Sequence, residues 1–224
     1  MNDRYTALRQ TGAATVVDSA AHRVLRNTYM MLSLCLGFAA LAAGASATLG
    51  LPHPGIILTL LGYFGLLYLV NKNRDSALGV VFLFALTGFM GYTLGPVISM
   101  YLKMPNGSQV VMTALGGTAA IFLALSAYAL TTKRDLSFMG GFLMVGVLVA
   151  FLAGIAALLL NITALSLAVS AVFVLLMSGM ILYETNNIVR GGETNYVLAT
   201  LSLFVSIFNL FTSLLHLLGF ANKE

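Results

Sequence analysis

The last long apolar stretch of the chain, YVLATLSLFVSIFNLFTSLLHLLG (Tyr196–Gly219), decides the fold. About 20 apolar residues in a helix, rising about 1.5 Å each, cross the roughly 30 Å hydrocarbon core of a bilayer, and this stretch is long enough to do so. Five polar side chains, here called the polar stripe, recur in it at spacings of four, three, four and three: Ser202, Ser206, Asn209, Ser213 and His216. Such spacing lines one side of a helix. A polar stripe on an apolar span should turn inward, so the sequence predicts a central helix packed on several sides.

Six further apolar runs precede this stretch, each bounded by charges or turn residues: Thr28–Leu51, Gly55–Val70, Ala77–Leu102, Ser108–Leu130, Ser137–Leu160 and Ala164–Val189. The chain of 224 residues is 59% hydrophobic and only 8% charged, whereas soluble domains are about 25% charged. Short connections leave no room for a second domain. The sequence therefore predicts an all-α membrane protein, a seven-transmembrane-helix bundle over residues 27–224 with the last helix central.

Residues 1–26 are polar and lack the apolar segment of about 7–15 residues that a cleavable signal peptide needs. We expect a loose tail there, with an amphipathic surface helix as the weaker alternative. Nine basic residues lie in this tail and in one set of connections: Arg4, Arg9, Arg23, Arg26, Lys72, Arg74, Lys133, Arg134 and Arg190. The opposite set has only Lys103 and Lys223. Because basic residues favour the cytoplasmic side, the N-terminus should be cytoplasmic and the C-terminus periplasmic.

Glu184 is the one carboxylate inside an apolar run. An ionisable group at membrane depth costs roughly 2.5–3.5 kcal/mol, so it usually faces the bundle interior or water and finds a partner. Asn187 and Arg190 follow at spacings of three, which places all three on one helix face, and the Arg190 guanidinium would neutralise the carboxylate. The candidate gate or ion site therefore combines this face with the start of the polar stripe: Glu184, Asn187, Arg190, Ser202, Ser206 and Asn209. The alternative is that the serines and asparagines only join helices, at about 0.6 kcal/mol per hydrogen bond.

Enzyme and cofactor signatures are missing from the sequence. It contains no HExxH, GxSxG, P-loop or paired-cysteine motif, and its three histidines are His22, His53 and His216. A serine nucleophile at Ser46 with His216 as base is less plausible than small-residue packing of the first helix. We expect no catalytic residue, no resident metal and no cofactor, with calcium at Glu184 as the one ion to consider. The net charge of +4 is explained by the membrane asymmetry, so nothing favours a nucleic-acid partner.

Four separated stretches resemble the Bax inhibitor-1 family, in the same order: GYTLGP (Gly91–Pro96), ALGGTAAIF (Ala114–Phe122), TTKRDLSFMGG (Thr131–Gly141) and ILYETNNIVRGGETNY (Ile181–Tyr196). The resemblance extends from about His22 to the end of the chain. It implies seven helices, the last surrounded by the other six. It also implies one of two activities: a proton-sensitive calcium leak, or, in bacterial inner-membrane members, a substrate and modulator of the membrane AAA protease FtsH, which grips a cytoplasmic tail.

In the leak-forming members, the resemblance implies a pair of aspartates on the sixth and seventh helices that gates the ion path. Glu184 matches the first, but Ser206 stands at the second, within LSLFVSIFNLF (Leu201–Phe211), so the acidic pair is broken here. The leading prediction is thus a non-enzymatic inner-membrane modulator and substrate of FtsH, whose partners are that protease, its associated membrane regulators and the lipid bilayer. The alternative functions are a calcium or cation leak with one carboxylate, and a purely structural scaffold.

Overall fold

The computed structural model describes the backbone of residues 2–222 and the side chains of residues 20–222, and this part of the chain forms seven helices without strands. The helices are α1 (Asn2–Thr48), α2 (Ile56–Lys72), α3 (Ala77–Leu102), α4 (Gly107–Thr131), α5 (Met139–Leu159), α6 (Thr163–Val189) and α7 (Tyr196–Ala221). Bounds predicted for the last six agree with these to within two residues. The all-α fold is therefore confirmed, because charges and turn residues mark the ends of apolar runs clearly.

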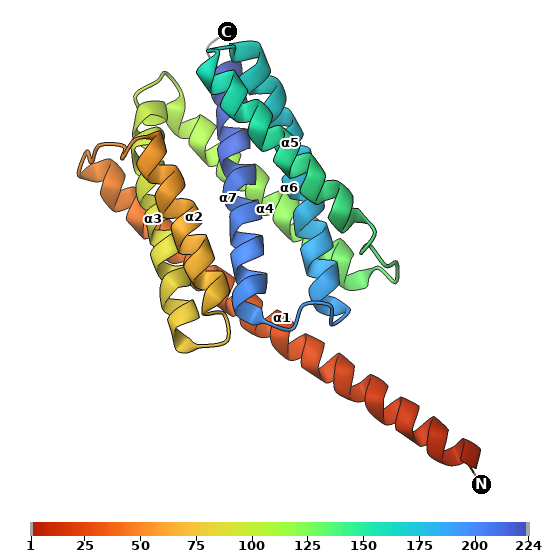
Figure 1. The fold of residues 1–224 in the computed structure, drawn as a ribbon. Coiled ribbons are helices and arrows are strands. Elements are labelled where there is room, and N and C mark those ends of the chain that lie inside the picture. Colours follow the sequence, from red (N-terminus) through yellow and green to blue (C-terminus); the bar gives the residue numbers. More distant parts are fainter. Residues whose placement is uncertain (1, 223–224) are drawn as a thin grey trace.

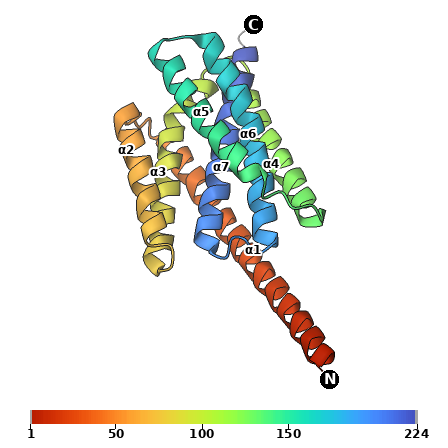
Figure 2. The same cartoon turned by 45° about the vertical axis from the view of Figure 1, so that its right-hand side comes forward.

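The first helix differs from the prediction. Residues 2–26, expected to form a loose tail, continue α1 without a break, and this part of α1 projects beyond the bundle in Figures 1 and 2. The physical reason is that extending an existing helix costs far less than nucleating one. The segment is also rich in alanine and arginine, which favour the helix.

Six of the seven helices are long and apolar enough to cross a membrane, and α2 is the shorter one. Its 17 residues extend about 26 Å, slightly less than the roughly 30 Å hydrocarbon core. A bilayer accommodates a short apolar helix by local thinning and by snorkelling of flanking residues such as Lys72 at its end. The N-terminus and C-terminus lie at opposite ends of the bundle (Figure 1).

The last helix lies in the middle of the bundle, as predicted. Figures 1 and 2 show α7 between α2 and α3 on one side and α4 and α6 on the other, and it contacts all four as well as α1. Leu203, Phe204 and Leu210 on α7 are almost completely buried. One detail differs from the expectation of six surrounding helices: within the described residues α5 packs against α6, meets α2 through the edge-to-face rings of Phe64 and Phe151, and does not pack against α7. Large apolar side chains of α5, such as Phe142 and Leu152, remain exposed, which suits a helix that faces lipid.

The glycines of α3 allow it to pack closely against α1. A Cβ atom added to Gly91 would lie 2.2 Å from the backbone oxygen of Ala39, and one added to Gly95 would lie 2.5 Å from the Ser46 side chain. Only glycine permits such close approach of two helix backbones. Pro96 follows these glycines, and α3 continues through it to its end.

Candidate functional site

Glu184 of α6 faces Ser206 of α7 inside the bundle. The Ser206 hydroxyl lies 3.4 Å and 3.3 Å from the two carboxyl oxygens of Glu184, toward which it donates. Glu184 is 8% exposed and Ser206 is 2% exposed. Ser206 is the only hydrogen-bond partner of this carboxyl group among the described residues. Two residues that the sequence pattern selected on different helices are thus brought together.

Arg190 does not reach Glu184, so the predicted neutralisation of the carboxylate is wrong. Its guanidinium is exposed and donates instead to the backbone oxygen of Lys133 in the α4–α5 connection. The reason lies at the helix end: Val189 is the last residue of α6, and Arg190 caps it with its backbone N–H bonded to the Asn186 oxygen. A side chain beyond the last turn can point toward a neighbouring loop rather than along the helix face.

The asparagine that the spacing selected is less buried than its neighbour. Asn187 is half-buried, and its backbone oxygen accepts from the Gly192 N–H at the end of α6. Asn186, which the sequence analysis missed, is 1% exposed. Its Oδ1 accepts from the Leu136 N–H at 3.2 Å, and its Nδ2 donates to the Arg134 oxygen at 3.3 Å. Asn186 therefore fixes the α4–α5 connection to α6.

The polar stripe turns inward only in part. Ser206 and Ser213 are buried, but Ser202 is exposed, and the Asn209 amide donates to the Val205 oxygen of its own helix at 2.8 Å. Of the three α7 side chains predicted for the candidate ion site, Ser202, Ser206 and Asn209, Ser206 alone meets Glu184. His216, at the other end of α7, contacts Ser170 of α6. The stripe thus makes two separate polar contacts with α6 rather than one continuous site.

Asn195, a second residue that the sequence analysis missed, organises the start of α7. Its Oδ1 accepts from the Val197 and Leu198 N–H groups, which is N-terminal capping. Its Nδ2 donates to the Asp75 Oδ1 at 2.8 Å and to the Arg74 oxygen at 3.1 Å. An asparagine directly before an apolar run is a sequence signal for a helix cap, so this role was open to prediction. Its contacts with the α2–α3 connection could not be predicted from the sequence.

Asp135 lies in the α4–α5 connection, outside the spans. The Ser137 hydroxyl and backbone N–H, together with the more distant Arg190 charge, hold the pKa of this carboxyl below its usual value of 3.8. The backbone bond from Ser137 measures 2.8 Å. Hydrogen bonds therefore hold all three connections at this end of the bundle: Asp135 and Asn186 bond within or to the α4–α5 connection, and Asn195 joins the α6–α7 connection to the α2–α3 connection.

The fold and this site define a class: an all-α, multi-pass membrane protein with a buried polar contact between its last two helices. The sequence profile of the family described as Inhibitor of apoptosis-promoting Bax1 matches residues 21–223. The chain therefore belongs to the Bax inhibitor-1 family.

Relatives cover nearly the whole chain. It is 52% identical over 205 residues to the Modulator of FtsH protease YccA of Escherichia coli strain K12, covering 92% of this chain and 93% of that one. The same identity is found with a protein of E. coli O6:H1 named Inner membrane protein YccA. An uncharacterised protein of Pseudomonas aeruginosa is 50% identical over 215 residues, which are 96% of this chain and 97% of its own. The chain is thus a multi-pass inner-membrane protein.

Proposed function

We propose that this protein modulates the membrane protease FtsH and is itself a substrate of it, without enzymatic activity of its own. The observation that carries the proposal is the 52% identity, over more than nine-tenths of both chains, to a protein named as a modulator of FtsH protease. Identity of this extent covers most of the bundle, so most of the surface on which such a modulator could depend has a counterpart here.

The projecting part of α1 supports the proposal. This helix has 47 residues and extends about 70 Å, more than twice the roughly 30 Å hydrocarbon core. The start of this helix projects from the bundle (Figure 1), and the backbone of residues 2–20 spans about 28 Å. This segment lies at the same end as the α2–α3, α4–α5 and α6–α7 connections (Figure 1), which carry basic residues and, by the positive-inside rule, are cytoplasmic.

A protease that acts from the cytoplasm can begin on such a terminus, because this part of α1 projects from the bundle (Figure 1). The test removes residues 1–20 and measures two quantities in cells: turnover of the protein itself and turnover of a second FtsH substrate. We expect the truncated protein to persist longer and to inhibit the protease at least as strongly. A control that keeps 20 residues of the same composition in scrambled order should be degraded like the native chain. If neither quantity changes on truncation, the proposed engagement is wrong.

A second candidate function is a cation leak, favoured by the buried carboxyl group of Glu184 beside the Ser206 hydroxyl. Calcium takes six to eight oxygen ligands, often with more than one carboxylate, whereas this contact supplies one carboxyl and one hydroxyl. Calcium flux into liposomes tests this function. A leak requires flux through the native chain that Glu184→Gln abolishes. If the native chain shows no flux because the second carboxylate is missing, Ser206→Asp supplies that carboxylate and should produce calcium flux. Zero flux through the native chain and both variants rejects the leak.

A further inference from the structure

The α4–α5 connection gathers positive charge at one end of the bundle. It carries Lys133 and Arg134, and the Arg190 guanidinium at the end of α6 donates to the Lys133 backbone oxygen. That bond places the third cation beside the other two in space, although 56 residues separate it from Arg134 in the sequence. All three residues are exposed. The proposed FtsH function does not use them.

Hydrogen bonds hold the backbone that carries these side chains. The Asn186 Oδ1 accepts from the Leu136 N–H at 3.2 Å, and its Nδ2 donates to the Arg134 backbone oxygen at 3.3 Å. Leu136 itself is buried and anchors the connection from below. Because Asn186 lies one turn before Arg190 on α6, the connection is fixed at the last turn of that helix. The three cations therefore belong to one fixed structural unit.

These positive charges have little opposing charge within the chain. Among residues 20–222, the Lys133 and Arg134 side chains form no ion pair and no hydrogen bond. The acids closest to them in the sequence, Asp135 and Glu193, accept from backbone N–H groups of their own connections at 2.8 Å and 2.7 Å. Asp135 is also attracted by the Arg190 charge, without a direct ion pair. Three cations against the one acid of the connection leave an excess of positive charge.

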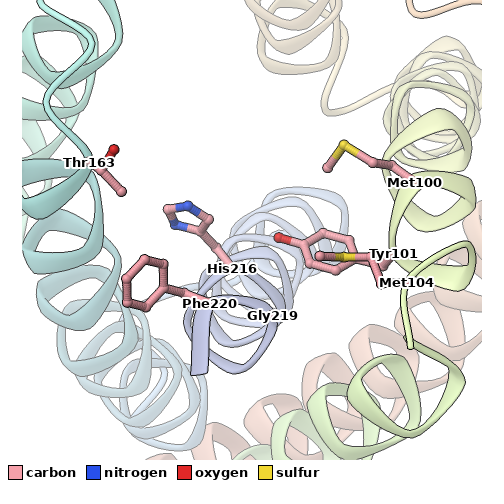
Figure 3. A pocket seen from close by; sticks show the side chains of 7 residues that line it. All are labelled: Met100, Tyr101, Met104, Thr163, His216, Gly219 and Phe220. Atoms are coloured by element: carbon pink, nitrogen blue, oxygen red, sulfur yellow. The ribbon is translucent and has the colours of Figure 1, made fainter. Parts of the chain in front are cut away.

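Two other parts of the surface offer an anion less. In the α2–α3 connection, the Arg74 Nε lies 3.5 Å from the Asp75 Oδ2, so this cation is already paired. At the opposite end of the bundle, a cavity of about 190 Å³ is lined by side chains such as Tyr101 and His216, and no lysine or arginine lines it (Figure 3). Unpaired cations on a fixed backbone therefore point to the α4–α5 connection.

An apolar face of α5 continues from these charges into the membrane. Phe138 and Phe142, four residues apart, are 79% and 76% exposed, and Val145 and Val149 continue the same exposed side. From Phe138 to Val149 the helix rises about 17 Å, close to the roughly 15 Å of hydrocarbon in one leaflet. A phospholipid has the matching arrangement, with a phosphate group at the surface and acyl chains of leaflet length beneath it.

We propose that the α4–α5 connection and the exposed side of α5 bind one anionic phospholipid. Its phosphate group lies among the side chains of Lys133, Arg134 and Arg190, and its acyl chains lie along the Phe138 and Phe142 side of α5. Basic clusters next to a transmembrane helix attract anionic head groups, and arginine and lysine both bind phosphate oxygens. A guanidinium has five N–H donors, so Arg190 can keep its bond to the Lys133 oxygen and still donate to the lipid.

The test compares phosphatidylglycerol with phosphatidylcholine, using the purified full-length protein in detergent and native mass spectrometry to count bound lipids. The native protein should bind one phosphatidylglycerol at least tenfold more tightly than phosphatidylcholine. Lys133→Gln combined with Arg134→Gln should lower the affinity for phosphatidylglycerol about tenfold or more and remove the preference. Both side chains are exposed and unbonded, so the double variant keeps the hydrogen bonds of the connection and should fold like the native protein.

Lys72→Gln combined with Arg74→Gln is the matched control, because it removes two positive charges from the α2–α3 connection at the same end of the bundle. It should change the affinity by less than about threefold. Inorganic phosphate, at constant ionic strength, should not displace the lipid, because it has no acyl chains to lie against α5.

The proposal is overturned if the native protein binds both lipids equally or if the double variant at 133 and 134 keeps the preference. It is also overturned if the control variant loses as much affinity, since the attraction would then be a general effect of surface charge. Displacement of the lipid by inorganic phosphate would show an anion site and not a phospholipid site.

Discussion

Replacing Ser206 by alanine should destabilise the protein by leaving the Glu184 carboxyl buried without a donor. The hydrogen bond itself is weak, because its distances of 3.3 Å and 3.4 Å exceed the roughly 2.7–2.8 Å typical of hydroxyl donors. The larger contribution is the desolvated carboxyl group, which loses its only described partner. An unsatisfied buried polar group costs about 1–3 kcal/mol. For a chain of this size, where each kcal/mol shifts Tm by about 2–4 °C, the expected fall in Tm is roughly 2–12 °C.

Thermal unfolding in detergent or nanodiscs measures this effect, and a double-mutant cycle separates it from packing. Glu184→Met combined with Ser206→Ala removes both polar groups, and we expect it to lie close to native stability, because replacing both partners by apolar groups is nearly neutral. Ser202→Ala, one turn earlier on α7 and exposed, should change stability by less than about 0.5 kcal/mol. The reasoning is refuted if Ser206→Ala is as mild as Ser202→Ala, or if the costs of the two changes at 184 and 206 simply add.

Three further predictions concern the rest of the fold. Asn186→Ala removes two hydrogen bonds to the α4–α5 connection and should cost about 1–3 kcal/mol in thermal unfolding, whereas Asn187→Ala should cost much less. Gly91→Ala should destabilise by about 1–3 kcal/mol, because its Cβ would meet the backbone of α1, whereas Gly141→Ala, with nothing within 4 Å, should be neutral or stabilising. The folded state lowers the pKa of Asp135, so the contribution of its ionised carboxylate to stability is complete above pH 3.8 and is lost as the pH falls further. Asp135→Asn should therefore remove that part of the fall in Tm at acid pH.

The helices could be predicted from the sequence because a bilayer imposes a length on each span and because charges mark the ends. The central position of α7 followed from its polar stripe, since polar side chains avoid lipid. What periodicity could not supply was the helical course of α1 before Thr28, where apolar residues are few and helix propagation decides. It also could not show that α5 packs mainly against α6 and not against α7, because an apolar helix has the same sequence pattern whether protein or lipid covers it.

The sequence predicted the position of site residues correctly only in the interior of a helix, where the spacing fixes the direction of each side chain. Glu184 and Ser206 lie well inside α6 and α7, so their faces follow from the spacing, and the structure brings them together. Arg190 lies past the last turn of α6, where the spacing no longer fixes its direction, and it bonds to a loop instead. Asn186 was missed because its partners are backbone groups of the α4–α5 connection, a contact that no pattern within α6 reveals.

The most direct test of the proposed function is a titration of this protein against purified FtsH in proteoliposomes, with degradation of an unrelated membrane substrate as the measured rate. A modulator should lower that rate in a saturable manner as its ratio to the protease rises, while it is itself degraded more slowly than the substrate. A rate that stays unchanged at every ratio, with the protein demonstrably inserted and folded, would contradict the account.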